Sequence, residues 1–146
     1  MTVREPNQPE ACLSLQSKLS EIAQLPSWIG ELALRHAISK DVEFAINVCL
    51  EEAVSNVIRH GYGDGEEGMV TVHFAMPAPE SFEFVVEDEA QHFNPLDAPT
   101  PDTRGTPRVG GQGVHFLRHF TEKLEYTMTP TGNRLTMIFA GADSGT

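Results

Sequence analysis

Residues 50–62 read Leu-Glu-Glu-Ala-Val-Ser-Asn-Val-Ile-Arg-His-Gly-Tyr and form the second half of a helix that we predict over residues 41–60. At about 100° per residue, one apolar stripe runs along this helix, made of Val42, Ile46, Cys49, Leu50, Ala53 and Val57. Glu52, Asn56 and His60 recur every four residues, so their side chains stack along the edge of that stripe. A carboxylate, an amide and an imidazole that face inward must be paired or must serve a ligand, because burying bare polar groups is costly. We therefore expect the chemistry of the protein on this helix.

The composition describes a globular domain with an acidic surface. The chain has 146 residues, of which 40% are hydrophobic and 21% are charged, as in a folded domain and unlike a disordered chain. We predict one domain over residues 1–146, with its core over about residues 11–140 and a polar tail on either side. The formal net charge of -11 and the lack of a Lys/Arg-rich run argue against direct binding to DNA or RNA. An acidic surface suits a basic protein partner, although many ordinary soluble proteins carry one.

The cysteines and the N-terminal residues indicate a reduced compartment. Cys12 and Cys49 lack the spacing of a metal or redox motif, and Cys49 falls on the apolar stripe as a small core residue. The first ten residues are polar and contain two prolines, unlike a signal peptide, and no apolar run approaches membrane-spanning length. We expect a cytoplasmic protein without a membrane partner.

The periodicity of the chain predicts an α+β fold. It indicates strands over residues 11–15, 69–76, 81–88, 123–129 and 134–140, and helices over residues 26–39, 41–60 and 112–120. Gly61 is well placed to end the second helix as its C′ residue. Helices on one face of a mostly antiparallel sheet make a two-layer α/β sandwich. Residues 89–111 are rich in proline and glycine, which indicates a functional lid or a disordered loop.

Glu52 and Asn56 are the first candidate site residues. A carboxylate can act as a general base toward a hydroxyl, and an amide oxygen is a hard ligand that suits Mg²⁺. The alternative is a solvated pair at the sheet edge, because this spacing is common in helices. His60 taken alone is expected to be a structural histidine at the helix end.

Asp88 and a glycine-rich turn are further candidates for a ligand site. Asp88 ends a strand of Phe and Val residues, where its carboxylate can accept hydrogen bonds from an exocyclic amine such as that of adenine; the alternative is an ordinary turn-initiating aspartate. Residues 110–113 read Gly-Gly-Gln-Gly and lead into a helix, whose free N–H groups can hold phosphate. The alternative is a flexible loop, since the turn lacks the Walker lysine. His115 and His119 have a spacing that can bind zinc, but without an obvious third ligand we expect surface residues.

The order of these motifs resembles the GHKL ATPase superfamily. The segments that carry the resemblance are residues 50–62, 86–95 (Val-Glu-Asp-Glu-Ala-Gln-His-Phe-Asn-Pro), 110–117 and 131–137 (Thr-Gly-Asn-Arg-Leu-Thr-Met). Within the superfamily the chain looks most like the bacterial anti-sigma-factor serine/threonine kinases, because it is short and because Phe-Asn-Pro follows the aspartate motif. The resemblance implies the Bergerat-type ATP-binding fold, with ATP and Mg²⁺ as ligands.

The resemblance also implies roles for the motif residues. Glu52 matches the general base that takes the proton from a substrate serine or threonine. Asn56 matches the Mg²⁺ ligand, and Asp88 matches the aspartate that recognises the adenine amino group. Gly111 and Gly113 match the glycines that cradle the phosphates.

The chain departs from the family pattern after Asp88. The family's Asp-x-Gly-x-Gly becomes Asp-Glu-Ala-Gln-His, which removes both glycines. Ala90 is small enough to pass under an adenine, whereas His92 adds bulk and a titratable group near the pocket mouth. Arg108, just before the glycines, could contact a phosphate.

The function that the resemblance implies is protein phosphorylation in a partner switch. Such a protein sequesters a sigma factor or a similar regulator, phosphorylates an anti-anti-sigma (STAS-like) protein, and forms a homodimer. The altered motif after Asp88 favours an alternative, a non-catalytic nucleotide-binding module that sequesters a regulatory protein. Phosphorylation of His60 itself ranks lower, because the helix end is expected to be buried.

Overall fold

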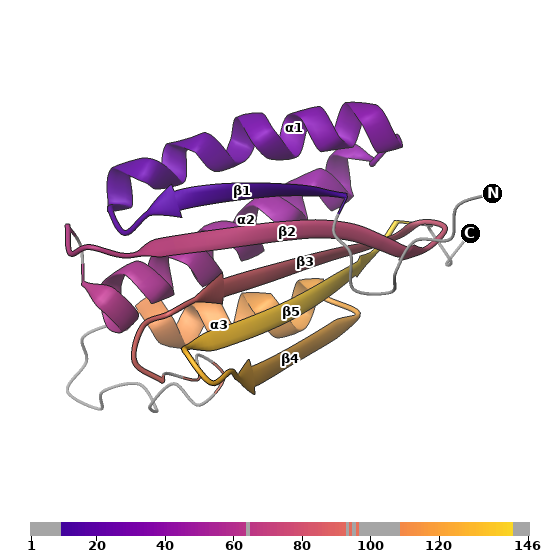
Figure 1. The fold of residues 1–146 in the computed structure, drawn as a ribbon. Helices are drawn as coiled ribbons and strands as arrows, with labels where there is room; N and C mark the ends of the chain where they lie inside the picture. The colour runs from indigo at the N-terminus through magenta and orange to yellow at the C-terminus, as the bar shows by residue number, and fades with distance from the viewer. Residues whose placement is uncertain (1–9, 64, 93, 95, 97–108, 142–146) are drawn as a thin grey trace.

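The sheet forms one layer of the molecule, and the helices form the other (Figure 1). The computed structural model describes residues 10–63, 65–92, 94, 96 and 109–141, with only the backbone for residues 109–114. The five strands have the order β1-β2-β3-β5-β4, and every neighbouring pair is antiparallel. Their bounds are Ala11–Gln16 (β1), Met69–Ala78 (β2), Ser81–Asp88 (β3), Lys123–Met128 (β4) and Asn133–Ala140 (β5). The predicted α+β class and the antiparallel hairpin of β2 and β3 are confirmed.

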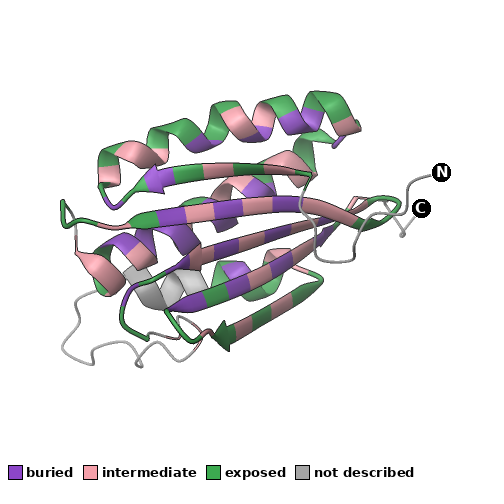
Figure 2. Cartoon of the chain, viewed as in Figure 1, coloured by how far each residue is buried: buried purple, intermediate pink, exposed green. Residues whose placement is uncertain are grey.

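Side chains alternate between the two faces of the sheet, as Figure 2 shows by the stripes along each strand. On β3, Phe82, Phe84 and Val86 are buried against the helices, while the residues between them are half-buried on the opposite face. The helices are α1 (Leu25–His36), α2 (Lys40–Asn56) and α3 (Val109–Phe120). Trp28 of α1 packs edge-on against Phe84, with ring centroids 6.0 Å apart. The helices therefore cover one face of the sheet, which confirms the predicted two-layer sandwich.

Aromatic rings on neighbouring strands form the centre of the core. Phe74 of β2 lies opposite Phe84 in the register, and their ring centroids are 5.1 Å apart. Phe84 also contacts Phe139 of β5 edge-on at 6.0 Å. Aromatic pairs of this kind add about 0.5–1.5 kcal/mol beyond the area that they bury. Cys49 is fully buried in the core, as its place on the apolar stripe predicts.

Helix α1 ends at His36, three residues earlier than the periodicity predicts. A helix was expected to continue to residue 39, but Ala37 takes a left-handed conformation (φ 56°) and stops the helix at His36. Ser39 instead caps α2, because its Oγ accepts a hydrogen bond from the backbone N–H of Val42 at 3.2 Å. The short 3₁₀ helix η1 (Leu19–Gln24), which precedes α1, was not predicted.

The motif helix continues beyond α2 as a π-helix, η2 (Val57–Tyr62). Gly63, not Gly61, ends it: Gly63 has φ 106°, and its N–H donates to the carbonyl of Ile58 at 2.7 Å. The assignment of Gly61 as the C′ residue was therefore wrong. Gly61 lies inside the wide turn, where a Cβ atom would sit 2.9 Å from the Cβ of Ala90. A glycine is required there by close packing rather than by the end of the helix.

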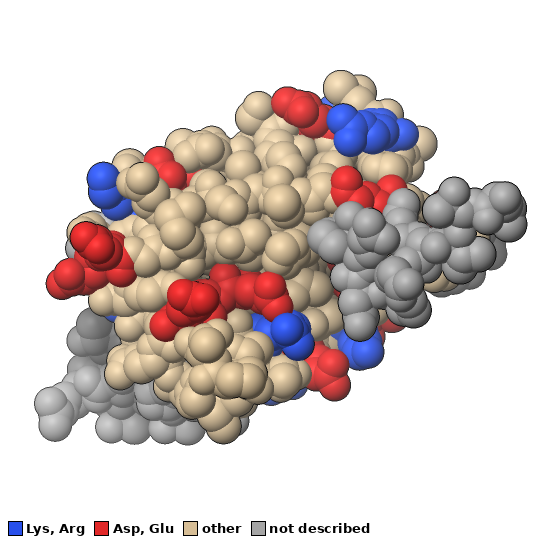
Figure 3. Space-filling view, viewed as in Figure 1, with Lys and Arg blue, Asp and Glu red and all other residues tan. Residues whose placement is uncertain are grey.

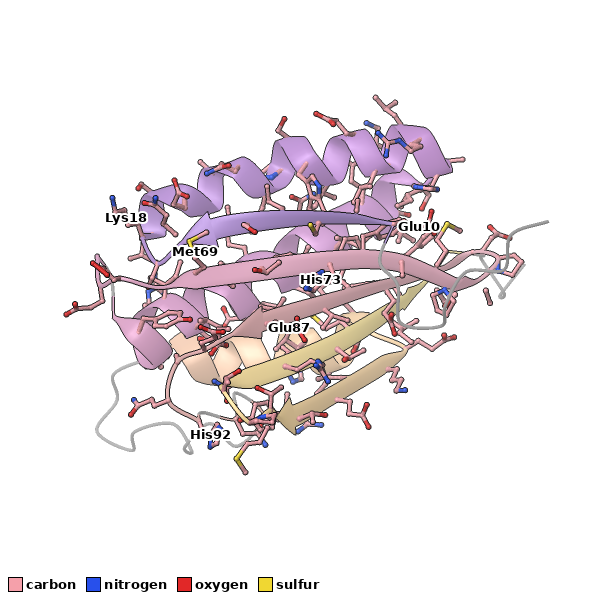
Figure 4. All side chains as sticks on the ribbon, in the orientation of Figure 1. Glu10, Lys18, Met69, His73, Glu87 and His92 are labelled. Atoms are coloured by element: carbon pink, nitrogen blue, oxygen red, sulfur yellow. The ribbon has the colours of Figure 1, made fainter. Side chains whose placement is uncertain are left out.

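Polar and ionic pairs occupy the face of the sheet that the helices do not cover. Glu87 of β3 lies between His73 and Arg134, with 3.0 Å from Oε1 to His73 Nε2 and 2.6 Å from Oε2 to Arg134 Nε. Burial alone would raise the pKa of Glu87, but the hydrogen bond and charge of Arg134, together with His73, bring it below its ordinary value. Figure 3 shows acidic groups that adjoin basic ones on this face, and Figure 4 shows His73 and Glu87 side by side. Within the described residues, no helix is both long enough and apolar enough to cross a membrane.

The packing of α1 predicts that Gly30→Ala stabilises the protein. A Cβ atom on Gly30 would meet only Glu43 Oε2, at 3.7 Å, which is an ordinary contact. Alanine in a helix interior is favoured over glycine by about 0.5–1 kcal/mol, so the free energy of unfolding in urea should rise by that amount. Gly132→Ala is the opposite control, because its Cβ would lie 1.9 Å from the carbonyl oxygen of Asp88. A loss of stability in Gly30→Ala would contradict the open packing at this position.

Candidate functional site

The end of the motif helix and the end of β3 enclose one pocket between the helix layer and the sheet. Its cavity volume is about 20 Å³, and it is lined by Ala53, Asn56, Val57, Gly61, Val86, Asp88, Tyr126, Asn133 and Leu135. The pocket brings Asn56 and Asp88 together, although they are 32 positions apart in the chain. Aliphatic walls with a few buried polar groups are typical of a site for a small ligand.

Glu52 and Asn56 stand one helical turn apart beside this pocket. Asn56, the last residue of α2, is only 5% exposed, and Glu52 is half-buried. Glu52 Oε2 is buried and has no hydrogen-bond partner among the described residues. Burial raises the pKa of Glu52, and this rise is opposed by a hydrogen bond from Asn56 and by the charge of Arg59. A carboxylate with an unpaired oxygen and a raised proton affinity can accept a proton from a hydroxyl group.

Asp88 is buried at the end of β3 with two donors on one of its oxygens. Its Oδ1 accepts from the backbone N–H of Ala90 and from Asn133 Nδ2, each at 2.8 Å. Burial raises the pKa of Asp88, whereas the bonds from Asn133 and Ala90 and the charge of His92 lower it. A carboxylate held this way at a pocket wall can accept a hydrogen bond from a ligand amine, as the sequence predicts.

Hydrogen bonds hold the segment 89–91, which follows Asp88, against residues 60–62 of η2. The backbone N–H of Glu89 donates to the Tyr62 hydroxyl at 2.7 Å, and Gln91 Nε2 donates to the carbonyl of His60 at 3.3 Å. Between these bonds, Ala90 is buried against Gly61. The Tyr62 hydroxyl also donates to the carbonyl of Met69 at 3.0 Å, which ties the segment to the start of β2.

Ala90 and His92 are not among the described residues that line the pocket. Ala90 is behind the pocket, against Gly61, and is not one of the residues that line it. His92 is exposed, and its Nε2 lies 3.2 Å from the carbonyl oxygen of Thr129 in the β4–β5 turn (Figure 4). The described pocket lining does not include His92, but its charge lowers the pKa of Asp88, which lines the pocket.

His60 is exposed, so the prediction that it faces inward at a buried helix end was wrong. Its place followed from a spacing of four residues, which completes about one turn of an α-helix. In η2 the hydrogen bonds close over five residues, as between Gly63 and Ile58. Four residues then fall short of a full turn, and His60 is rotated away from the line of Glu52 and Asn56.

The glycine-rich motif begins α3 rather than preceding it. The helix was expected from about residue 112 but starts at Val109, so Gly111 and Gly113 lie in its first turn and a half. The first four N–H groups of a helix have no partner within it, so this end keeps the capacity to bind an anion. Arg108 and most of the predicted lid, residues 97–108, lie outside the described residues. His115 and His119 are exposed, and no group of three metal-binding side chains occurs in the described part of the chain.

Tyr126, Gly132 and Asn133 are site residues to which sequence reasoning assigned no role in the site. Asn133 lies directly opposite Asp88 in the register of β3 and β5, and the Tyr126 hydroxyl donates to its Oδ1. Gly132 lets the β4–β5 turn lie against the end of β3, since a side chain there would overlap the backbone of Asp88. Gly132 and Asn133 lie in the segment 131–137 that carries the resemblance, but neither was assigned a role in the site from the sequence, and Tyr126 lies outside the quoted segments.

Comparison with known proteins identifies the family. The sequence profile of the histidine kinase-like ATPase domain matches residues 15–139, which is most of the chain. The chain belongs to this family. It therefore falls within the GHKL superfamily that its motifs resemble, and the antiparallel sheet with helices on one face is the fold of that superfamily.

Individual relatives are more distant. The chain is 25% identical over 113 residues to the serine/threonine-protein kinase BtrW of Bordetella bronchiseptica, covering 75% of this chain and 79% of that protein. Two solved structures share the fold at low identity. The RsbU and RsbW domains of a Mycobacterium tuberculosis protein give a TM-score of 0.64 at 16% identity, with 90% of this chain and 33% of that chain covered. The histidine kinase domain of a blue-light activated histidine kinase from Erythrobacter litoralis gives 0.54 at 17% identity, with 84% and 60% covered.

The environment of Glu52 predicts that Glu52→Gln stabilises the ligand-free protein. A carboxylate whose folded pKa lies above its ordinary value of 4.5 costs stability once the pH rises through the raised value. The free energy of unfolding of Glu52→Gln should therefore exceed that of the wild type at pH 7, and the difference should shrink as the pH falls toward 4.5. Urea denaturation at several pH values measures this difference.

Glu51→Gln is the matched control for the stability measurement. Glu51 is exposed on the same helix, so the variant removes one negative charge without removing a buried one. If Glu52→Gln were less stable than the wild type at pH 7, the Glu52 carboxylate would have to be paired in the folded protein.

Proposed function

We propose that this protein is an ATP-dependent protein serine/threonine kinase of the anti-sigma-factor type. The observation that carries the proposal is the buried, unpartnered Oε2 of Glu52, one turn from buried Asn56 and beside the pocket that contains Asp88. Membership of the histidine kinase-like ATPase family supports the nucleotide, and similarity to the kinase BtrW supports transfer to a protein.

The residues present fit ATP and Mg²⁺. Asn56 offers an amide oxygen, a hard ligand that suits Mg²⁺, and Glu52 Oε2 is a buried polar atom without a partner in the described chain. When bound, Mg²⁺ neutralises charge on the phosphates during phosphoryl transfer. Asp88 and the apolar walls of the pocket would hold the base, Ala90 would support the segment behind Asp88, and Gly111, Gly113 and Arg108 would hold the phosphates.

Glu52 acts as the general base in the proposed reaction. Burial raises the pKa of its carboxyl group, so it takes a proton more readily than an exposed carboxylate does. Phosphoryl transfer depends mainly on positioning and charge stabilisation, and a base has only to hold and deprotonate the acceptor hydroxyl. Glu52 and Asn56 are four residues apart on one helix, so the proposed base and the proposed metal ligand lie one turn from each other.

The proposed partners are an anti-anti-sigma (STAS-like) protein as the phosphate acceptor and a sigma factor or similar regulator as the sequestered target. The resemblance of the motifs to anti-sigma-factor kinases supports this type of partner, and similarity to the serine/threonine-protein kinase BtrW supports a protein as the phosphate acceptor. A cytoplasmic homodimer is the proposed form of the protein. The acidic net charge of -11 is compatible with basic surfaces on a partner.

Loss of the base should abolish transfer but preserve nucleotide binding. In a labelled-ATP assay with proteins co-purified from the source cell, Glu52→Gln should reduce phosphate transfer by about 100-fold or more, the usual contribution of a positioned base. ATP affinity, measured by calorimetry, should stay within a few fold of the wild type. Glu51→Gln, which changes the exposed neighbour, should transfer at the wild-type rate. Equal rates for Glu52→Gln and the wild type would remove Glu52 as the base.

Asp88→Asn should weaken ATP binding. A hydrogen bond to a charged acceptor contributes about 1.5–3 kcal/mol, so calorimetry with ATP and Mg²⁺ should show a loss of about 10- to 100-fold. Binding by the wild type without any phosphate transfer would favour the non-catalytic sequestering module. If the wild type binds no nucleotide at millimolar concentration, the kinase proposal fails.

A further inference from the structure

A pair of side chains behind Asp88 determines how this carboxylate is presented to the pocket. Asn133 is the first residue of β5 and faces Asp88 across the sheet, and Tyr126 comes from the neighbouring strand β4. Asn133 is only 6% exposed, so its amide needs hydrogen bonds from the protein. Both side chains also line the pocket.

The hydrogen bonds of Asn133 fix the orientation of its amide group. Its Nδ2 donates to Asp88 Oδ1 at 2.8 Å and to the carbonyl of Gln91 at 3.0 Å, and its Oδ1 accepts from the Tyr126 hydroxyl. A rotated amide would direct its oxygen at two acceptors, Asp88 Oδ1 and the carbonyl of Gln91, and would lose both of these hydrogen bonds. Hydrogen bonds therefore hold both the nitrogen and the oxygen of the Asn133 amide.

These hydrogen bonds fix the orientation of the Asp88 carboxylate. Oδ1 has two donors, Asn133 Nδ2 and the backbone N–H of Ala90, whereas the described residues place no donor on Oδ2. With Oδ1 held at two points, the plane of the carboxylate cannot turn without breaking a hydrogen bond. Oδ2 is then the oxygen that remains to accept a hydrogen bond from a ligand.

We propose that Asn133 is a positioning residue for recognition of the nucleotide base, which orients Asp88 so that it accepts from the exocyclic amine, and that Tyr126 holds Asn133 in place. This inference rests on the proposed nucleotide-binding function and adds residues that set specificity for an amino-purine. It follows from the hydrogen bonds of Asn133 and Tyr126, because sequence reasoning assigned no role in the site to either residue.

The test compares binding of two ligands that differ only in the amine. The probes are ADP and purine riboside 5′-diphosphate, which has hydrogen in place of the 6-amino group, each with Mg²⁺ and measured by calorimetry. In the wild type, ADP should bind about tenfold or more tightly than the analogue, as expected for one hydrogen bond to a charged acceptor. Asn133→Ala should bring this ratio to within about twofold of one, mainly by weakening ADP. A purely structural role would weaken both ligands equally and leave the ratio unchanged.

Asn133→Asp separates positioning from direct contact. This isosteric change keeps an oxygen but removes the Nδ2 donor that holds Asp88, so the ratio should be lost as in Asn133→Ala. If Asn133→Asp keeps the wild-type ratio, the amide oxygen contacts the base directly and the positioning role is wrong. Tyr126→Phe should reduce the ratio of ADP affinity to analogue affinity partly. If thermal unfolding shows that neither Asn133 variant folds, the ratio in Tyr126→Phe decides the test.

Arg134→Ala is the matched control on the same strand. Arg134 follows Asn133 but pairs with Glu87 on the opposite face of the sheet, so its loss weakens β5 without touching Asp88. It should leave the ratio at its wild-type value. If the wild type itself does not distinguish the two ligands, base recognition by Asp88 fails along with this inference. If the wild type distinguishes them and every variant at Asn133 and Tyr126 does so equally, only the positioning role is overturned.

Discussion

The candidate site depends on satisfying one buried carboxylate, Asp88, where the sheet, the motif helix and the β4–β5 turn meet. A buried charge is costly unless hydrogen bonds compensate for the lost water. Here the donors are the N–H of Ala90 and the amide of Asn133, which come from the two sides of the strand end. Gly132 allows the second side to approach, because a Cβ atom there would collide with the carbonyl of Asp88.

Neighbouring carboxylates on β3 show how the two faces of the sheet differ. Glu87 points to the open face and is paired with Arg134 and His73, which bring its pKa below the ordinary value. Asp88 lines the pocket, and burial raises its pKa; burial likewise raises the pKa of Glu52, one helical turn before the lining residue Asn56. The first arrangement stabilises the fold, whereas the second costs stability and leaves groups available to a ligand.

Hydrogen bonds to η2 hold the segment after Asp88, where the family pattern has glycines. The family pattern has two glycines there, and this chain has Ala90 and His92. Hydrogen bonds from Glu89 and Gln91 to η2 fasten the segment, and Gly61 provides the space that Ala90 occupies. Three successive residues of the π-helix, 60–62, contact the segment 89–91. The alanine that replaces a family glycine at position 90 is thus accommodated by a glycine at position 61 of η2.

Local pattern in the sequence determined the elements and the positions of Glu52, Asn56 and Asp88, because side-chain periodicity and strand ends depend on residues that are close in the chain. The tertiary structure decided the rest. It turned His60 outward through a π-turn, moved His92 onto the β4–β5 turn, and placed Asn133 and Tyr126 behind Asp88. The contacts of His92 with Thr129 and of Asn133 with Asp88 join residues that are 37 and 45 positions apart in the chain. Contacts between distant segments have no period in the sequence, so only the assembled sheet and helices could reveal them.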